Sequence, residues 1–165
     1  MSSSDYEIRQ FREEDRERII EIFNYYITES YAAYPSEKVE PEFFDQLMHG
    51  SHSFYVAEHE GRVVGFAFLK PYLPIATFRT TATVTYFIDP VHRRSGLGTH
   101  ILRTLESDAK ERGIHTLLAH ISSRNEESVN FHKKNGFSEC GRFPEIGMKF
   151  GERFDVIWVV KKLDS

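Results

Sequence analysis

The sequence has one cysteine, Cys140, among its 165 residues. One thiol can build neither a disulfide framework nor a thiolate cluster for zinc or iron–sulfur, so a reducing, cytoplasmic location is expected. Apolar runs are short as well, because stretches such as Val156 to Val160 fall far below the roughly 20 residues that cross a bilayer. Residues 1–20 lack the apolar core of an export signal. The sequence therefore predicts neither a membrane span nor secretion.

An excess of charge of one sign is also missing. The formal net charge is −4, and the positive residues are scattered among acids, which leaves no broad field for a nucleic-acid backbone. Nucleic acid is therefore not expected as a partner. His49 and His52 form an isolated pair and no His-Glu-x-x-His motif occurs, so no metal site is predicted. Neither a repeat nor a Gly/Ser/Pro-rich linker divides the chain, and residues 1–165 are predicted to form one domain.

The patterning that is present predicts a mixed α/β (α+β) protein. The hydrophobic share of 40% and the charged share of 28% are those of ordinary globular proteins. Helices are expected from Glu13, from Pro41, around Ile101 with Gly113 as a left-handed cap, and from a capping box of Ser123 and Glu126. Alternating, β-branched or aromatic segments predict the strands, which are expected at 6–11, 54–57, 63–69, 81–88, 116–121, 138–143 and 154–161.

The segment from Asp89 to Thr99 joins a predicted strand to a predicted helix through two closely spaced glycines, Gly96 and Gly98. Each glycine disfavours a helix by about 0.5–1 kcal/mol relative to alanine, and the close approach of an anion to the free amides of a helix N-terminus would explain both. A glycine-softened turn with two solvated arginines is the alternative. The ATP motif Gly-x-x-x-x-Gly-Lys-Ser/Thr is absent, and the NAD motif fails because Ile101 stands at its third glycine.

The run Arg93-Arg94-Ser95-Gly96-Leu97-Gly98 resembles the Gln/Arg-x-x-Gly-x-Gly/Ala coenzyme A loop of the GNAT acetyltransferases. The segment from Asn125 through His132 to Phe137 resembles the family's next helix. The tail, with Gly147–Gly151 as Gly-x-Lys-x-Gly and Asp155–Trp158 as Asp-Val-x-x-Trp, is similar to the phosphinothricin acetyltransferase branch. The resemblance covers nearly the whole chain. It implies the GNAT fold, a mixed, mainly antiparallel twisted sheet flanked by helices.

The resemblance also implies acetyl-CoA as co-substrate. Its pyrophosphate would rest on the loop amides and its pantetheine along the strand that ends at Ile88, where a free amide near Phe87 would polarise the thioester carbonyl. Asn125 would bind the coenzyme A arm, although asparagine is also a good helix N-cap. The implied cofactor-binding residues are Phe87, Ile88, Arg93, Arg94, Ser95, Gly96, Leu97, Gly98, Thr99, Asn125 and Ser128.

An acceptor amine with a pKa near ~10 must lose a proton before it attacks. His132 is the first candidate for acid or base, since many GNAT members carry tyrosine there and the phosphinothricin branch carries histidine; a surface histidine on a helix is the alternative. The branch usually has glutamate where this chain has Thr83, which is a poor base. Either Thr83 holds a water linked to a remote carboxylate, or the acceptor is not an acidic amino acid analogue.

Tyr34 lies in the segment that helps to wall the acceptor site in GNAT enzymes, and Arg79 could pair with an acceptor carboxylate; solvated loop side chains are the alternative for both.

The resemblance implies direct acetyl transfer in a ternary complex to a primary amine of a small molecule, an amino acid or an analogue such as phosphinothricin or methionine sulfone. Acetylation of a protein or peptide amine and a non-catalytic coenzyme A module are the alternatives. It also implies a homodimer with the C-terminal strands, including Val156 to Val160, near the interface, although burial within one subunit would explain that run equally well.

Overall fold

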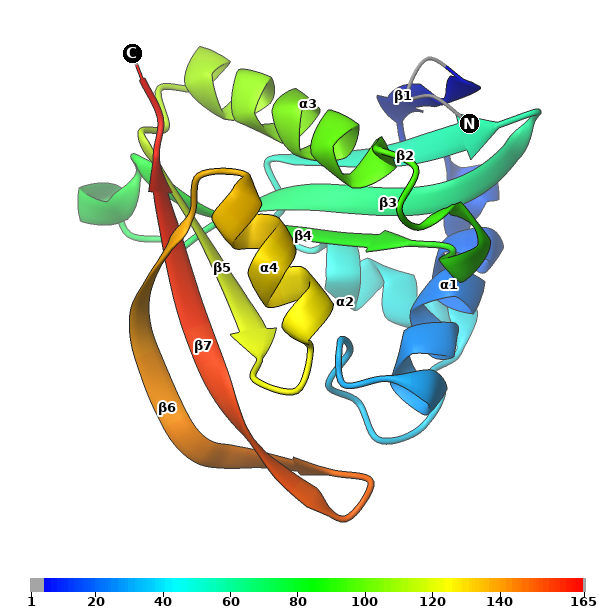
Figure 1. Cartoon of the computed structure of the whole chain (residues 1–165). Coiled ribbons are helices and arrows are strands. Elements are labelled where there is room, and N and C mark those ends of the chain that lie inside the picture. Colours follow the sequence, from blue (N-terminus) through cyan, green and yellow to red (C-terminus); the bar gives the residue numbers. More distant parts are fainter. Residues whose placement is uncertain (1–4, 165) are drawn as a thin grey trace.

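The computed structural model describes residues 5–164. The described strands form one sheet of seven in the order β1-β2-β3-β4-β5-β7-β6, in which only the β4–β5 pair is parallel. This confirms the predicted mixed, mainly antiparallel sheet (Figure 1). The elements are β1 (Glu7–Gln10), α1 (Arg16–Glu29), α2 (Phe44–Met48), β2 (Ser53–His59), β3 (Arg62–Pro71), β4 (Thr81–Ile88), α3 (Leu97–Glu111), β5 (Thr116–Ser122), α4 (Glu126–Lys134), β6 (Ser138–Lys149) and β7 (Glu152–Lys162).

Helices cover the two faces of the sheet in pairs. The apolar side of α1, which includes Ile19 and Ile27, packs with Phe44 of α2 against one face. The apolar stripe of α3, which includes Leu102 and Leu105, packs against the other face, where α4 also lies. Because successive side chains of a strand point to opposite faces, β2, β3 and β4 contribute to both clusters, whereas β5 and β7 contribute only to the cluster beneath α3. None of the helices within residues 5–164 is long and apolar enough to span a membrane.

The sheet opens between its two parallel strands. β4 and β5 pair only over the first three residues of β4, from Thr81 to Thr83. Beyond Thr83, β4 keeps its ladder with β3 as far as Ile88, while β5 keeps its ladder with β7 as far as Ser122. Each strand stays with its own half of the sheet, and a gap widens between the halves (Figure 1). We call this gap, bordered by residues 84–88 and 119–122, the splay.

An ion pair ties the first strand to the start of α1. Arg9 donates from Nη1 and Nη2 to the two carboxylate oxygens of Asp15, at 2.9 Å each, and the amide of Arg12 donates to the same carboxylate at 2.7 Å. Burial by itself would raise the pKa of Asp15, but the hydrogen bonds from Arg9 and Arg12 outweigh it and the pKa is lowered. Asp15 is therefore held as a buried, fully bonded carboxylate.

Several predicted boundaries need correction. The capping box is wrong, because α4 is capped by Asn125 and the Ser123 hydroxyl instead accepts a hydrogen bond from the amide of Asp155 at 2.9 Å. The last two strands are longer than predicted and form a hairpin that reaches from 138 to 162. The left-handed cap at Gly113 is confirmed, with φ of 76°.

Candidate active site

The loop between β4 and α3 presents unpaired backbone amides. Gly96 is left-handed, with φ of 86°, and Arg94 also has positive φ, at 61°. Within residues 5–164, the amides from Arg94 to Thr99 have no hydrogen-bond acceptor, and the first helical bond of α3 is His100 to Gly96 at 3.2 Å. A run of free amides at the N-terminus of a 15-residue helix is a suitable cradle for a phosphate. The loop therefore fits the pyrophosphate of coenzyme A.

The two glycines of this loop are needed for different reasons. A Cβ on Gly96 would meet nothing within 4 Å, so this position is open to a ligand and needs glycine for its backbone angle. A Cβ on Gly98 would lie 3.3 Å from the Phe131 ring. Gly98 therefore lets α3 pack closely on α4. The backbone angle explains Gly96 and this packing explains Gly98, so neither glycine by itself requires the anion that the sequence suggested.

The side chains of the loop divide into solvated and internal groups. Arg93 and Arg94 are 43% and 84% exposed, and each lies 3.7 Å from Glu127 of α4, so both remain available to an anion. The Ser95 hydroxyl donates to the His92 carbonyl at 2.7 Å and is used within the loop. Leu97 is fully buried, so it can offer only its amide. For Thr99, the hydroxyl lies 3.5 Å from Asn135 Oδ1.

The start of α4 adjoins this loop. Asn125 Oδ1 accepts a hydrogen bond from the Ser128 amide at 3.2 Å, which makes Asn125 the N-cap that the sequence allowed as the alternative. The Ser128 hydroxyl lies 3.3 Å from Nδ1 of His132. Contacts of Asn125 and Ser128 with coenzyme A therefore stay predictions.

Two free amides border the splay. Backbone groups along a strand point alternately to its two neighbours, and the odd-numbered residues from Thr81 to Asp89 bond to β3. The even-numbered residues face β5, which has moved away, so the amides of Tyr86 and Ile88 point into the gap. The amide of Phe87 faces β3, and its ring packs against α1. A free amide near Phe87 is therefore present at Tyr86 and at Ile88, and its role as an oxyanion donor stays a prediction.

His132 is neither exposed nor free. Its side chain is 3% exposed, its Nδ1 donates to the Ser128 carbonyl at 2.7 Å, and its Nε2 accepts from the Tyr86 hydroxyl. The alternative of a surface histidine is wrong. Burial lowers the pKa of His132, which keeps the ring neutral, and burial raises the pKa of Tyr86. Because both ring nitrogens are engaged, the role of His132 as acid or base stays a prediction, and its partner Tyr86 is a residue that the sequence did not single out.

Thr83, His120 and Tyr34 lie on the opposite face of the sheet. Ala82, Val84 and their neighbours on β5 belong to the core beneath α3, so the alternate residues Thr83 and His120 face the α1 side. Tyr34 comes from the segment after α1, and its hydroxyl lies 3.2 Å from Nδ1 of His120. Tyr34 thus lies beside His120 at the splay, and its role in an acceptor site stays a prediction. His120 was missed because only the fold reveals which face it occupies.

Arg79 lies away from this group. It follows a short turn at Ala76–Phe78, is exposed, and donates only to the Ala76 carbonyl at 3.3 Å. This is the solvated loop charge that the sequence allowed. No group of three His, Cys, Asp or Glu side chains suited to a metal occurs within residues 5–164.

The tail motif holds the wall of the splay in place. A Cβ on Gly147 would come within 2.6 Å of Phe154 Cε1 and closer still to Cζ, so only glycine leaves room for that ring. The Phe154 ring stacks on Tyr34, with centroids 5.9 Å apart at 12°. Lys149 is buried and donates from Nζ to the carbonyls of Ser30 and Ala33, at 2.6 Å each. The β6–β7 hairpin thereby fixes the segment that carries Tyr34.

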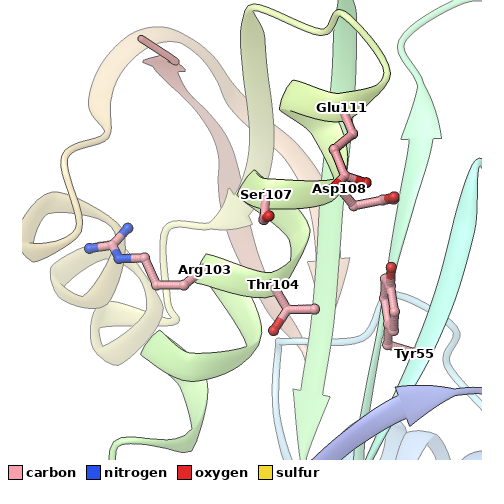
Figure 2. A pocket seen from close by; sticks show the side chains of 6 residues that line it. All are labelled: Tyr55, Arg103, Thr104, Ser107, Asp108 and Glu111. Carbon is pink, nitrogen blue, oxygen red and sulfur yellow. The ribbon is translucent and has the colours of Figure 1, made fainter. Parts of the chain in front are cut away.

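A hollow of about 390 Å³ lies elsewhere, between β2 and α3. Figure 2 shows Tyr55 of β2 facing a row of polar side chains on α3. None of the predicted site residues lines it. The hollow is shallow and lined by polar side chains. At the splay, in contrast, free amides and titratable side chains lie close together.

The fold and the splay define an acyltransferase of the coenzyme A type, and comparisons identify its family. Residues 16–137 match the acetyltransferase (GNAT) family. An L-amino acid N-acyltransferase, MnaT, of Escherichia coli (strain K12) is 29% identical, over 96% of this chain and 94% of its own length. A phosphinothricin N-acetyltransferase of Streptomyces viridochromogenes is 31% identical, over 91% and 84%.

A ribosomal-protein-alanine N-acetyltransferase from Brucella melitensis has a similar solved structure, with a TM-score of 0.87 and 31% identity over 95% of this chain and 99% of its own. The chain belongs to the GNAT acetyltransferase family. It is an acetyltransferase whose co-substrate is acetyl-CoA.

Proposed function

We propose that this protein transfers the acetyl group of acetyl-CoA to the primary amine of an amino acid or a close analogue, of the phosphinothricin or methionine sulfone kind. The observation that carries the proposal is the splay, which borders two free amides and opens onto a face lined by Tyr34 and His120. Relatives named for L-amino acids and for phosphinothricin support the acceptor class. Residues 1–165 are proposed to act as one GNAT domain.

The amides from Arg94 to Thr99 would hold the pyrophosphate, with the side chains of Arg93 and Arg94 adding positive charge; the Arg93 amide itself donates to the Pro90 carbonyl at 3.3 Å. When bound, acetyl-CoA supplies an activated acetyl thioester. The amide of Tyr86 or Ile88 would donate to the thioester oxygen as negative charge develops there, an effect worth about 2.7–4 kcal/mol for a well-placed donor. The Tyr86 hydroxyl donates its one proton to His132 and burial raises its pKa, so on the α4 side of the splay it would serve as a polar group near the departing sulfur rather than as its proton source.

Direct attack in a ternary complex is proposed because the splay offers no suitable acyl carrier. Cys140 lies on the outer strand β6, far along the sheet from β4, and its thiol contacts the Trp158 carbonyl at 3.4 Å. Its exposure as a free thiol also supports a reducing, cytoplasmic location. The Thr83 hydroxyl forms no hydrogen bond within residues 5–164, so the water that Thr83 and a remote carboxylate would hold stays a prediction.

A homodimer is proposed on the exposed apolar side chains of the last hairpin. Phe143, Ile146, Met148 and Phe150 are 54–60% exposed on β6 and its tip, at the edge of the sheet. In contrast, Ile157 and Val159 are buried within the subunit, so the run first considered for the interface serves partly as core. Analytical ultracentrifugation at micromolar concentration tests this, and a monomer would refute it.

The test of function is thiol release from acetyl-CoA with free amino acids, phosphinothricin, methionine sulfone, polyamines and short peptides, beside a calorimetric titration of acetyl-CoA. Turnover on the amino acid analogues is expected. Turnover on peptides alone would move the acceptor to protein, a reading that the Brucella melitensis relative favours. Binding without turnover would indicate a coenzyme A module that is not catalytic.

A further inference from the structure

His120 stands at the open end of the parallel pair. Leu118, two residues earlier on β5, is the last residue of that strand paired with β4, and its partner there is Thr83. If the ladder continued, His120 would lie beside Thr85. Instead the strands have parted, and the His120 ring borders the gap on the face opposite to Tyr86 and His132.

The His120 ring packs against two aromatic side chains and is bonded through one of its two nitrogens. Its Nδ1 lies 3.2 Å from the Tyr34 hydroxyl, and the two rings stack with centroids 5.6 Å apart at 24°. Trp158 of β7, the register partner of His120, packs at 5.0 Å. Within residues 5–164, Nε2 has no hydrogen-bond partner, and the side chain is exposed. One nitrogen is therefore fixed and the other is open to a ligand.

Two lysines lie near this face, Lys70 as the register partner of Thr83 and Lys149 beside the Tyr34 segment, but the ammonium group of each donates to backbone carbonyls. Tyr34 is the titratable group in contact with His120. Burial raises the pKa of Tyr34 to about 12, so it stays a neutral phenol. Trp158 and the threonines of β4 do not titrate near neutral pH. Desolvation lowers the pKa of His120, and no neighbouring charge contributes to that shift, so the ring is neutral and able to accept a proton at neutral pH.

We propose that His120 is the general base of the reaction, with Tyr34 as its positioning residue; this rests on the proposed function. Nδ1–H of His120 donates to the Tyr34 oxygen, which leaves the lone pair of Nε2 facing the splay. Nε2 takes a proton from the ammonium group of the acceptor. The freed amine nitrogen forms a bond to the acetyl carbon. As this adduct collapses, the carbon–sulfur bond breaks, the sulfur leaves with its electron pair, and the nitrogen gives its second proton to that sulfur, so that the products are the amide and the free thiol. The imidazolium returns its proton to solvent.

His120→Gln tests the assignment, because the amide keeps a polar group but cannot accept the proton. At pH 7 we expect kcat/KM for the acceptor to fall by about 100-fold or more, the usual contribution of a general base, and the acidic limb of the pH profile to disappear. The affinity for acetyl-CoA should be unchanged. His115→Gln, an exposed histidine just before the same strand, is the matched control and should leave the profile intact.

Tyr34→Phe keeps the ring stack and removes the oxygen, so it should shift the acidic limb and lower kcat with little change in the affinity for acetyl-CoA. The base assignment alone would be overturned by either of two results. One is that the acidic limb of the wild-type pH profile persists in His120→Gln, and the other is that kcat/KM falls by less than 3-fold in that variant. If the wild type acetylates no acceptor of the panel, the proposed function fails first. Direct titration of the His120 ring by NMR then still reports whether Nε2 is open and neutral, and a protonated ring at pH 7 would overturn the proposal.

Discussion

Gly147→Ala should damage both the stability and the acceptor site of this protein. The added Cβ would meet three atoms of the Phe154 ring at 2.6 Å or less, whereas ordinary contacts begin near 3.4 Å. The ring must therefore move by roughly 1 Å or more. Phe154 is only 7% exposed, so it has little free space to enter. Overpacking of this kind costs about 1–3 kcal/mol.

For a chain of this length, each kcal/mol corresponds to a change in Tm of about 2–4 °C. Thermal unfolding followed by circular dichroism should therefore show a decrease in Tm of about 2–12 °C for Gly147→Ala. Gly141→Ala is the matched control on the same strand, because a Cβ there meets nothing within 4 Å. Its effect should stay within about 0.5 kcal/mol.

Displacement of the ring should also reach the acceptor site, since Phe154 stacks on Tyr34. We expect a higher KM for the acceptor with an unchanged affinity for acetyl-CoA. In a double-mutant cycle with Phe154→Leu, the penalty of Gly147→Ala should shrink, because the smaller side chain frees the space. Equal Tm values for Gly147→Ala and Gly141→Ala would refute the steric argument.

Three other changes test separate parts of the structure. Gly96→Asp should weaken acetyl-CoA binding at least ~5-fold in calorimetry, since like charges about 4 Å apart repel by roughly 1–4 kcal/mol, whereas Gly113→Asp, at an equally left-handed and open position, should not. Asp15→Asn should cost about 1.5–3 kcal/mol at neutral pH. Because folding lowers the pKa of Asp15, its contribution is present above about pH 4 and lost as the pH falls through the folded value, so urea unfolding should show the two proteins converging in acid. His132→Ala should lower kcat and cost about 1–3 kcal/mol, because it leaves the Tyr86 hydroxyl buried without its partner, and an unchanged kcat would remove His132 from the chemistry.

Local sequence signals predicted the parts of the site that are local in the chain. The free amides from Arg94 to Thr99 follow from a strand, a glycine pair and a helix start, all within a short run. The strand from 81 to 88 was placed correctly because β-branched residues end at Pro90. Alternation along that strand also separates Tyr86 from Thr83, although which face each would occupy needs the packed helices.

The contacts missed from sequence are those between distant segments. Tyr34 and His120 are 86 residues apart, and Tyr86 and His132 are 46 apart, so no periodicity links them. The last hairpin was predicted too short for a different reason. From Ser138 to Ile146, β6 is exposed on both faces, and without a buried face its residues carry no alternation to detect. Its length follows from pairing with β7 instead.

The splay gives the reaction two chemically distinct sides. A continuous parallel ladder would bond the amides of Tyr86 and Ile88 to β5 and leave no opening through the sheet. With the ladder broken, those amides face the gap, the Tyr86 hydroxyl approaches from the α4 side, and His120 borders the opposite face. An acceptor entering past Tyr34 would lose its first proton to His120 on one face of the sheet, while the thioester sulfur would depart on the face of Tyr86.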